Sequence, residues 1–265
     1  MRGYWKRIAT GMTLALLVAI GPLSAQVAKP VVAAVDAARA PKVVLVELFT
    51  SEGCSSCPPA DALLQQIDGT QTGAGQLIVG ISEHVTYWNS LGWSDPFSSA
   101  IYTDRQNAYG EKFGLDSVYT PQMVINGAQQ VLGSSYAEVT RAIQKENEQP
   151  VRVALHIVSA SVAGSTLTVT FSTTGDASVQ GADVVAVLAD DTDRSSVLRG
   201  ENSGRTLAHI SVARSLVRVA KVQAAEQTVK IRIPLSFRAT EKHHLILFAQ
   251  AAGNGRVLGI DTRPL

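Results

Sequence analysis

The sequence predicts an α/β domain with the element order β-α-β-α-β-β-α, followed by an all-β sandwich-like domain. The first domain is indicated by an apolar, β-forming run that leads through Cys54-x-x-Cys57 into a helical pattern, and by a later Asn126-Gly127 hairpin signal. The second is indicated by short alternating runs separated by Gly, Asp and Asn clusters. With 46% hydrophobic and 17% charged residues, the 265-residue chain has a globular composition.

The N-terminal segment has the order of a signal peptide. A basic start, MRGYWKR, precedes an apolar run and then small residues up to Ala25. We expect residues 1–25 to be a cleaved signal peptide and residues 26–41 a linker, which makes the protein secreted or periplasmic. The alternative is that this segment stays uncleaved as a membrane anchor. We expect a membrane contact only in that case. Removal of this segment leaves 20 basic against 22 acidic residues without a basic patch, so we expect no nucleic-acid partner.

The first domain is expected over residues 42–148. Apolar periodicity, the Asp95-Pro96 helix-start signal, the hairpin dipeptide and the Ser135-x-x-Glu138 capping box place its elements in order. They are a strand at 43–49, a helix after Cys57 to about 68, a buried strand at 77–82, a helix from Pro96 to about 113, strands at 122–125 and 129–132, and a helix from 136 to about 145.

The second domain is expected over residues 150–265. Several of its runs alternate apolar and polar residues, as in Val229-Lys230-Ile231-Arg232-Ile233, which is typical of half-buried strands. Seven strands are predicted, at 151–159, 166–172, 183–188, 209–219, 228–235, 245–251 and 256–261. This number and spacing favour a β-sandwich.

The two cysteines are the centre of the predicted chemistry. The positive end of a helix favours a thiolate, so we expect Cys54 to be the more exposed, attacking thiol and Cys57 to resolve the mixed disulfide. A bridge across a four-residue loop would stabilise the fold by about 2 kcal/mol, against about 3 kcal/mol for a fifteen-residue loop. A purely structural role is therefore the weaker interpretation. Thiol exchange needs no cofactor.

Other motifs extend this interpretation. The cysteines, the element order and Thr120-Pro121 together resemble the thioredoxin superfamily, in which the proline is cis and lies beside the cysteines. Five motifs resemble more closely a secreted thioredoxin-like family catalogued as domain of unknown function 1223: ELFTSEGCSSCPPAD at 47–61, HVxYW at 84–88, LGWxDPF at 91–97, YTPQM at 119–123 and ENxGRxLxH at 201–209. The resemblance implies a fold and a redox pair but no substrate. Thr120 and Pro121 would present backbone to a substrate peptide.

Further side chains are candidates for tuning the pair or lining a substrate groove. They include one carboxylate, two hydroxyls, two indole rings, one guanidinium and two imidazoles, from segments that could lie near the cysteines. The candidates are Glu52, Ser55, Ser56, His84, Trp88, Trp93, Arg205 and His209. Each also has a plainer interpretation: packing for the tryptophans, a structural role for His84, a solvated carboxylate for Glu52, and an inter-strand loop for the segment around Arg205.

The predicted function is an extracytoplasmic thiol–disulfide oxidoreductase that acts on protein thiols or disulfides together with a redox partner protein. Whether it oxidises, reduces or isomerises depends on its potential rather than its motif. One alternative is a copper(I) carrier, because two thiolates can hold this soft ion. The five histidines have no zinc-site spacing, so we expect no other metal. Another alternative is a binding module with a structural disulfide.

Overall fold

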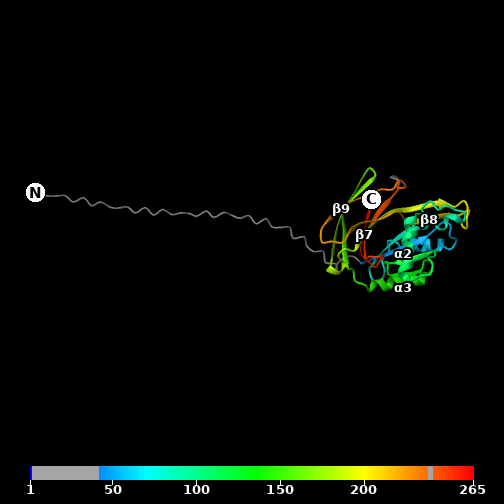
Figure 1. The fold of residues 1–265 in the computed structure, drawn as a ribbon, viewed down its shortest axis with the longest axis horizontal. Helices are drawn as coiled ribbons and strands as arrows, with labels where there is room; N and C mark the ends of the chain where they lie inside the picture. The colour runs from blue at the N-terminus through cyan, green and yellow to red at the C-terminus, as the bar shows by residue number, and fades with distance from the viewer. Residues whose placement is uncertain (2–41, 238–240) are drawn as a thin grey trace. The chain divides into compact units, whose positions relative to one another are not determined.

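A computed structural model describes residues 42–237 and 241–265, together with Met1 (Figure 1). The predicted linker and, apart from Met1, the predicted signal peptide lie outside the described residues. The described residues from Lys42 onward belong to one compact unit. No helix among the described residues is long and apolar enough to span a membrane.

The first half contains the expected elements in the expected order. These are β1 (Val43–Thr50), α1 (Pro58–Ile67), β2 (Leu77–His84), the 3-10 turn η2 (Asn89–Leu91), α2 (Ala100–Phe113), β3 (Gln122–Ile125), β4 (Gln129–Leu132) and α3 (Tyr136–Asn147). The start predicted for α2 is wrong. Ser99, not Asp95, caps this helix through a hydrogen bond from the Ile101 N–H, because Asp95 is engaged elsewhere.

The second half consists of strands, and one of its hairpins is much longer than predicted. The elements are β5 (Val153–Ala163), β6 (Thr166–Gly175), the 3-10 turn η3 (Ala177–Val179), β7 (Asp183–Ser196), β8 (Thr206–Lys221), β9 (Gln227–Arg232), β10 (His243–Gln250) and β11 (Val257–Pro264). A strand is present at each of the seven predicted places. β7 extends well beyond its predicted end, and β8 is slightly longer at both ends, so His209, predicted as the first residue of its strand, lies inside β8.

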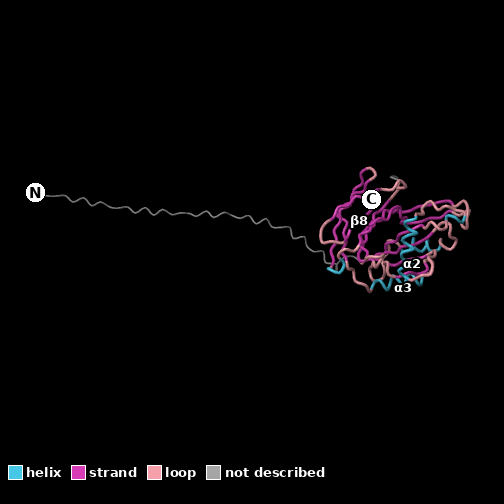
Figure 2. Tube along the Cα trace, in the orientation of Figure 1, coloured by secondary structure: helices cyan, strands magenta, loops and turns pink. Residues whose placement is uncertain are grey.

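The prediction of an α/β domain followed by a separate β-sandwich is wrong. One sheet of eight strands, in the order β11-β10-β7-β8-β2-β1-β3-β4, runs through both halves of the chain (Figure 2). The halves join where β8 pairs in parallel with β2, Ser82 opposite Val212, and where the Ser211 hydroxyl donates to the Gly80 carbonyl at 2.6 Å. Without β8 the outer edge of β2 would be unpaired, which is unfavourable for a buried strand.

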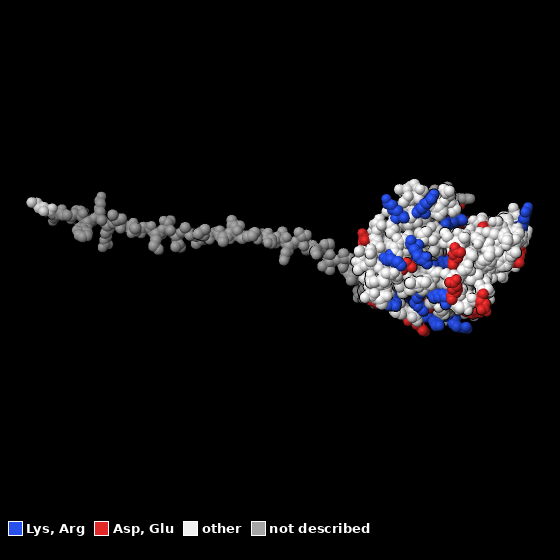
Figure 3. Space-filling model, in the orientation of Figure 1, with Lys and Arg blue, Asp and Glu red and all other residues white. Residues whose placement is uncertain are grey.

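Both faces of this sheet are covered. Alternate residues of β1 point to opposite sides: Val44, Val46 and Leu48 pack with α1 and α3, whereas Leu45 packs with Tyr102 of α2. The strands β5, β6 and β9 form a second sheet, which packs through Phe171 and its neighbours on β7 and β10. On the face drawn in Figure 3, basic and acidic side chains are interspersed.

Candidate functional site

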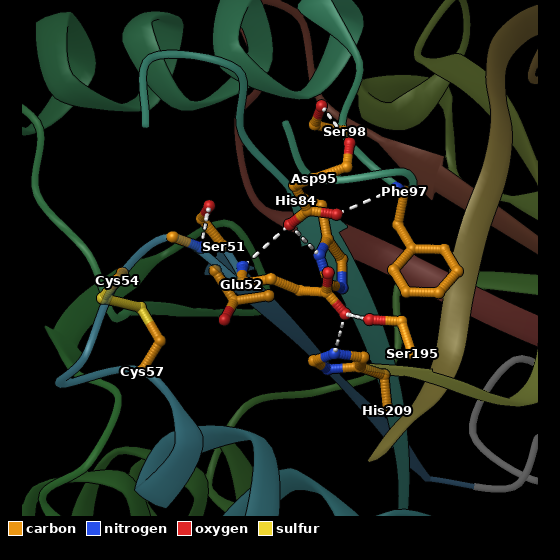
Figure 4. A network of polar contacts seen from close by, with 12 residues as sticks. Ser51, Glu52, Cys54, Cys57, His84, Asp95, Phe97, Ser98, Ser195 and His209 are labelled. Carbon is orange, nitrogen blue, oxygen red and sulfur yellow. Dashed lines mark hydrogen bonds and ion pairs between the residues drawn. A yellow bond between two sulfur atoms is a disulfide. The ribbon is translucent and has the colours of Figure 1, made fainter. Parts of the chain in front are cut away.

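The Cys-x-x-Cys turn (residues 51–57) connects β1 to α1. Cys54 and Cys57 form a disulfide, and Cys57 is the N-cap residue of α1, with prolines in the first turn of the helix (Figure 4). Because Pro58 and Pro59 have no N–H, the helix acts on the sulfurs through its dipole rather than through first-turn donors. The Ser56 hydroxyl lies 3.4 Å from the Cys54 sulfur.

Neither cysteine is accessible to solvent. Cys54 and Cys57 are both 0% exposed, and only Ser55 and Ser56 between them face solvent. The expectation that Cys54 is the more exposed thiol is therefore wrong for the disulfide form. A partner could not reach the Cys54 sulfur without a local rearrangement.

The β7–β8 loop (residues 197–205) contacts the turn from the second half of the chain. The Asn202 amide donates to the carbonyl oxygens of Glu52 and Cys54, both at 2.9 Å. The Ser55 N–H donates to the Glu201 carboxylate at 2.9 Å, and hydrogen bonds from Ser55 lower the pKa of Glu201. Arg205 reaches the turn only indirectly, through a 2.9 Å hydrogen bond to the Asn202 side-chain oxygen.

A buried ionic cluster lies behind the turn. His209 Nε2 is 3.3 Å from Glu52 Oε1, and His209 Nδ1 is 3.6 Å from Asp61 Oδ1, a distance for an ion pair rather than a hydrogen bond. Glu52 also accepts hydrogen bonds from Trp93 Nε1, at 2.8 Å, and from the Ser195 hydroxyl. The side chains of Glu52 and His209 are almost completely buried, so the interpretation of Glu52 as a solvated carboxylate is wrong.

The cluster holds Glu52 and His209 in their charged forms. Burial opposes the charge on His209, but the neighbouring Asp61 and Glu52 outweigh it and raise the pKa of the imidazole to about 10. Burial likewise opposes ionisation of Glu52, but its hydrogen bonds, foremost from His209, hold the pKa of this carboxyl below its ordinary value. At neutral pH the ion pair is therefore formed.

A second histidine joins this cluster through Asp95. His84 Nδ1 is 2.7 Å from Asp95 Oδ2, which also accepts a 2.8 Å hydrogen bond from the Glu52 N–H (Figure 4). Burial would raise the pKa of Asp95, but His84 and the backbone donors lower it. The rings of His84 and His209 meet edge to face at 4.6 Å, and Phe97 packs against both. His84, Asp95, Glu52 and His209 thus form one unit.

Trp88 connects the Cys-x-x-Cys turn to the loop that carries Thr120 and Pro121. Its indole N–H donates to the Thr120 hydroxyl at 2.8 Å. A Cβ on Gly53 would lie only 3.1 Å from the Trp88 Cβ, so Trp88 lies directly against the turn at Gly53. The Thr120–Pro121 peptide bond is cis, as the resemblance to the thioredoxin superfamily implies.

The comparisons with known proteins agree with a site built from both halves. A family model described as "Protein of unknown function (DUF1223)" matches residues 45–250. The chain belongs to this family. The matched range includes both the cysteines and the β7–β8 loop, so the family spans the sheet that joins the two halves.

Two solved structures share the fold. A protein from Agrobacterium tumefaciens is similar with a TM-score of 0.62 and 28% identity, over 84% of this chain and 94% of that one. HBP35 of Porphyromonas gingivalis is similar with a TM-score of 0.62 and 14% identity, over 84% of this chain and 75% of that one. At that identity the likeness to HBP35 concerns the fold alone. No curated protein matches this chain significantly.

Several residues of the site were not predicted from the sequence. Asp61 carries a recognisable signal, because it follows Cys57 by four positions and so shares its face of α1. The others come from distant segments: Asp95, Ser195, Glu201 and Asn202. Asp95, Glu201 and Asn202 lie in the motifs at 91–97 and 201–209, but the motifs do not show which residues they contact. Of the predicted tuning residues, Glu52, His84, Trp93 and His209 come together, and Trp88 lies against the turn at Gly53. Arg205 contacts the site through Asn202.

Among the described residues, no group of three or more side chains that could share a metal ion includes either cysteine. In the part of the chain that the structure describes, the one group of three or more ligand-type side chains that could share an ion is Asp190, Asp193 and Glu241. It contains neither cysteine, and the guanidinium of Arg214 already bonds both aspartates. This group is an ion-pair cluster away from the Cys-x-x-Cys turn.

Proposed function

We propose that this protein exchanges thiols and disulfides with protein substrates outside the cytoplasm. The observation that supports this most is the Cys54–Cys57 bridge itself, which closes a short loop at the start of α1 next to a buried ionic cluster. Such a bridge stabilises the fold little, since its loop is so short. The described residues already form two sheets with buried hydrophobic cores, so a chemical role for the bridge is favoured.

The proposed reaction begins with a substrate thiolate that attacks the Cys54 sulfur. A new disulfide forms between substrate and Cys54, the Cys54–Cys57 bond breaks, and its electron pair remains on Cys57 as a thiolate. A second substrate thiol, as its thiolate, then attacks the substrate sulfur that is bonded to Cys54. A disulfide forms within the substrate, and Cys54 leaves as a thiolate. The substrate leaves with a disulfide and the protein gains two electrons; the reverse sequence reduces a substrate.

Local charges suit these steps. The positive end of α1 favours a thiolate at either cysteine, and the Ser56 hydroxyl, 3.4 Å from the Cys54 sulfur, can donate to it. The ionised Glu52 and His209 contribute opposite charges, so their net effect on the cysteines is smaller than that of either alone.

Trapping with Cys57→Ser tests the proposal. In the reverse sequence the Cys54 thiolate attacks a substrate disulfide, and Cys57 then resolves the mixed disulfide. Without Cys57 this resolution from within the protein is lost, so substrates that carry a disulfide should remain bound through Cys54. We expect covalent adducts that dithiothreitol releases, purified from the native extracytoplasmic compartment. The double variant Cys54→Ser/Cys57→Ser is the matched control and should yield none. If Cys57→Ser also yields none, the proposed exchange is wrong.

A further inference from the structure

We propose that the β7–β8 loop is a gate on Cys54, in which Asn202 and Glu201 are positioning residues that hold the loop closed over the disulfide form and release it when Cys54 becomes a thiolate. This inference rests on the proposed function, because it concerns access to the same sulfur. It begins from the complete burial of Cys54 in a turn that the loop contacts at three residues, Glu52, Cys54 and Ser55.

Asn202 holds the loop against the Cys-x-x-Cys turn through its side-chain amide. Its side chain is buried, with only 1% of the residue exposed. The amide nitrogen bridges the carbonyls of Glu52 and Cys54, and the amide oxygen accepts from Arg205. Both ends of the amide are therefore bonded, and opening the loop exposes two backbone carbonyls of the turn at once. Each such hydrogen bond contributes about 1 kcal/mol to stability. The two bonds from the Asn202 amide therefore favour the closed loop but still allow it to open.

Hydrogen bonds within the β7–β8 loop make it a rigid unit. Its own backbone bonds close it into a compact turn: the Gly204 N–H donates to the Val197 carbonyl at 2.8 Å, and the Val197 N–H to the Arg205 carbonyl at 2.9 Å. It also rests on the segment after η2, because a Cβ on Gly200 would lie 3.2 Å from the Trp93 Cβ. The bonds to the Cys-x-x-Cys turn are therefore the points at which a rigid loop is attached.

Glu201 makes the attachment sensitive to the redox state. In the disulfide form, neither sulfur is charged and the Glu201 carboxylate accepts freely from the Ser55 N–H. Reduction that leaves a thiolate on Cys54 places a second negative charge one residue away from that N–H. Like charges repel, and the N–H of Ser55 is then drawn toward two acceptors. The closed loop thus slows attack on the disulfide, whereas the open loop favours the reverse sequence, in which the Cys54 thiolate attacks a substrate disulfide.

Two measurements on the full-length protein test the gate. The first is the rate at which dithiothreitol reduces the Cys54–Cys57 bridge. We expect Asn202→Ala to raise this rate about tenfold and Glu201→Gln about threefold, since two bonds and one bond are lost or weakened. Glu226→Gln, an exposed glutamate in the loop between β8 and β9, is the matched charge control and should leave the rate unchanged. Circular dichroism and urea midpoints establish that each variant is folded.

The second measurement is amide hydrogen exchange of residues 198–205 in the oxidised and reduced protein. We expect exchange at least fivefold faster after reduction, with most of this difference lost in Glu201→Gln, because the repulsion is removed. Equal exchange in both redox states, or equal reduction rates for Asn202→Ala and the unsubstituted protein, overturns the gate. The proposed function fails separately: Cys57→Ser then traps no protein even though Asn202→Ala is reduced faster.

Discussion

Two buried ionic networks lie along β1 and β2, and only one of them borders the disulfide. The site network (Glu52, Asp61, His84, Asp95, His209) surrounds the Cys-x-x-Cys turn. The interior network (Glu47, Glu83, Arg105, Tyr109, Gln250) lies deeper, in the middle of the sheet. Both join residues from the two halves of the chain. Buried charge by itself therefore does not mark a reactive site here.

The two networks differ in how their charge is balanced. In the interior network, burial and then the charge of Glu47 raise the pKa of Glu83, so one neutral carboxyl and one carboxylate share the Arg105 guanidinium. In the site network, His209 is itself the cation and is titratable. The cation of the interior network, Arg105, thus keeps its charge, whereas the cation of the site network, His209, can lose its proton.

The largest expected effect comes from Arg105→Met. It leaves Glu47 buried without its cation, which should cost about 4 kcal/mol in the free energy of unfolding. Urea denaturation measures this loss. Arg141→Met, at an exposed position of α3, is the control and should change stability by less than about 0.5 kcal/mol. Under conditions where Arg105→Met is folded, its disulfide should be reduced at the unsubstituted rate; a large change in that rate would mean that the networks are not separate.

His209→Gln should have the next largest effect. Its ion-pair distances, 3.3 and 3.6 Å, are longer than the shortest Arg105 contact, and glutamine can still donate to Glu52. We expect a loss of about 3 kcal/mol at pH 6. Unlike Arg105→Met, this substitution should also change the reduction potential of the cysteine pair. A loss of stability with an unaltered reduction potential would mean that His209, like the interior network, has only a structural role.

The pH dependence distinguishes the networks further. The folded pKa of His209, about 10, lies above its ordinary value of 6.5, so its stabilisation is complete below about pH 6.5 and is lost as the pH rises through 10. The pKa of Glu52 is lowered from 4.5, so its contribution is present above that pH and is lost on acidification. Urea unfolding between pH 6 and pH 10 should show the gap between the unsubstituted protein and His209→Gln closing. A constant gap would contradict the assigned charge on His209.

Ser195→Ala should have the smallest effect. It removes one hydrogen bond to Glu52 and leaves the His209 and Trp93 contacts, so we expect a loss of about 1 kcal/mol at pH 7. The acid limb of the stability profile should also move to higher pH, because Glu52 loses a donor that favours its charged form. An unshifted acid limb would show that this hydroxyl does not contribute to the charge state of Glu52.

The sequence predicted local features better than long-range partners. The run from β1 through Cys54 into α1, the Asn126–Gly127 hairpin and the strands of the second half follow from periodicity and turn chemistry, which depend on neighbours in the chain. The pairing of β8 with β2 depends on residues far apart, so the sequence suggested two domains where one sheet exists. For the same reason Asn202 was overlooked, 148 positions from the carbonyl of Cys54 that it bonds.

The central claim is that the Cys54–Cys57 bridge is exchange-active rather than structural. Its reduction potential tests this most directly, measured by alkylating free thiols after equilibration in a graded series of glutathione and dithiothreitol buffers. The account predicts a midpoint between about −270 and −120 mV, the range of dithiol–disulfide exchange proteins. A midpoint below about −300 mV, where structural disulfides lie, would contradict it.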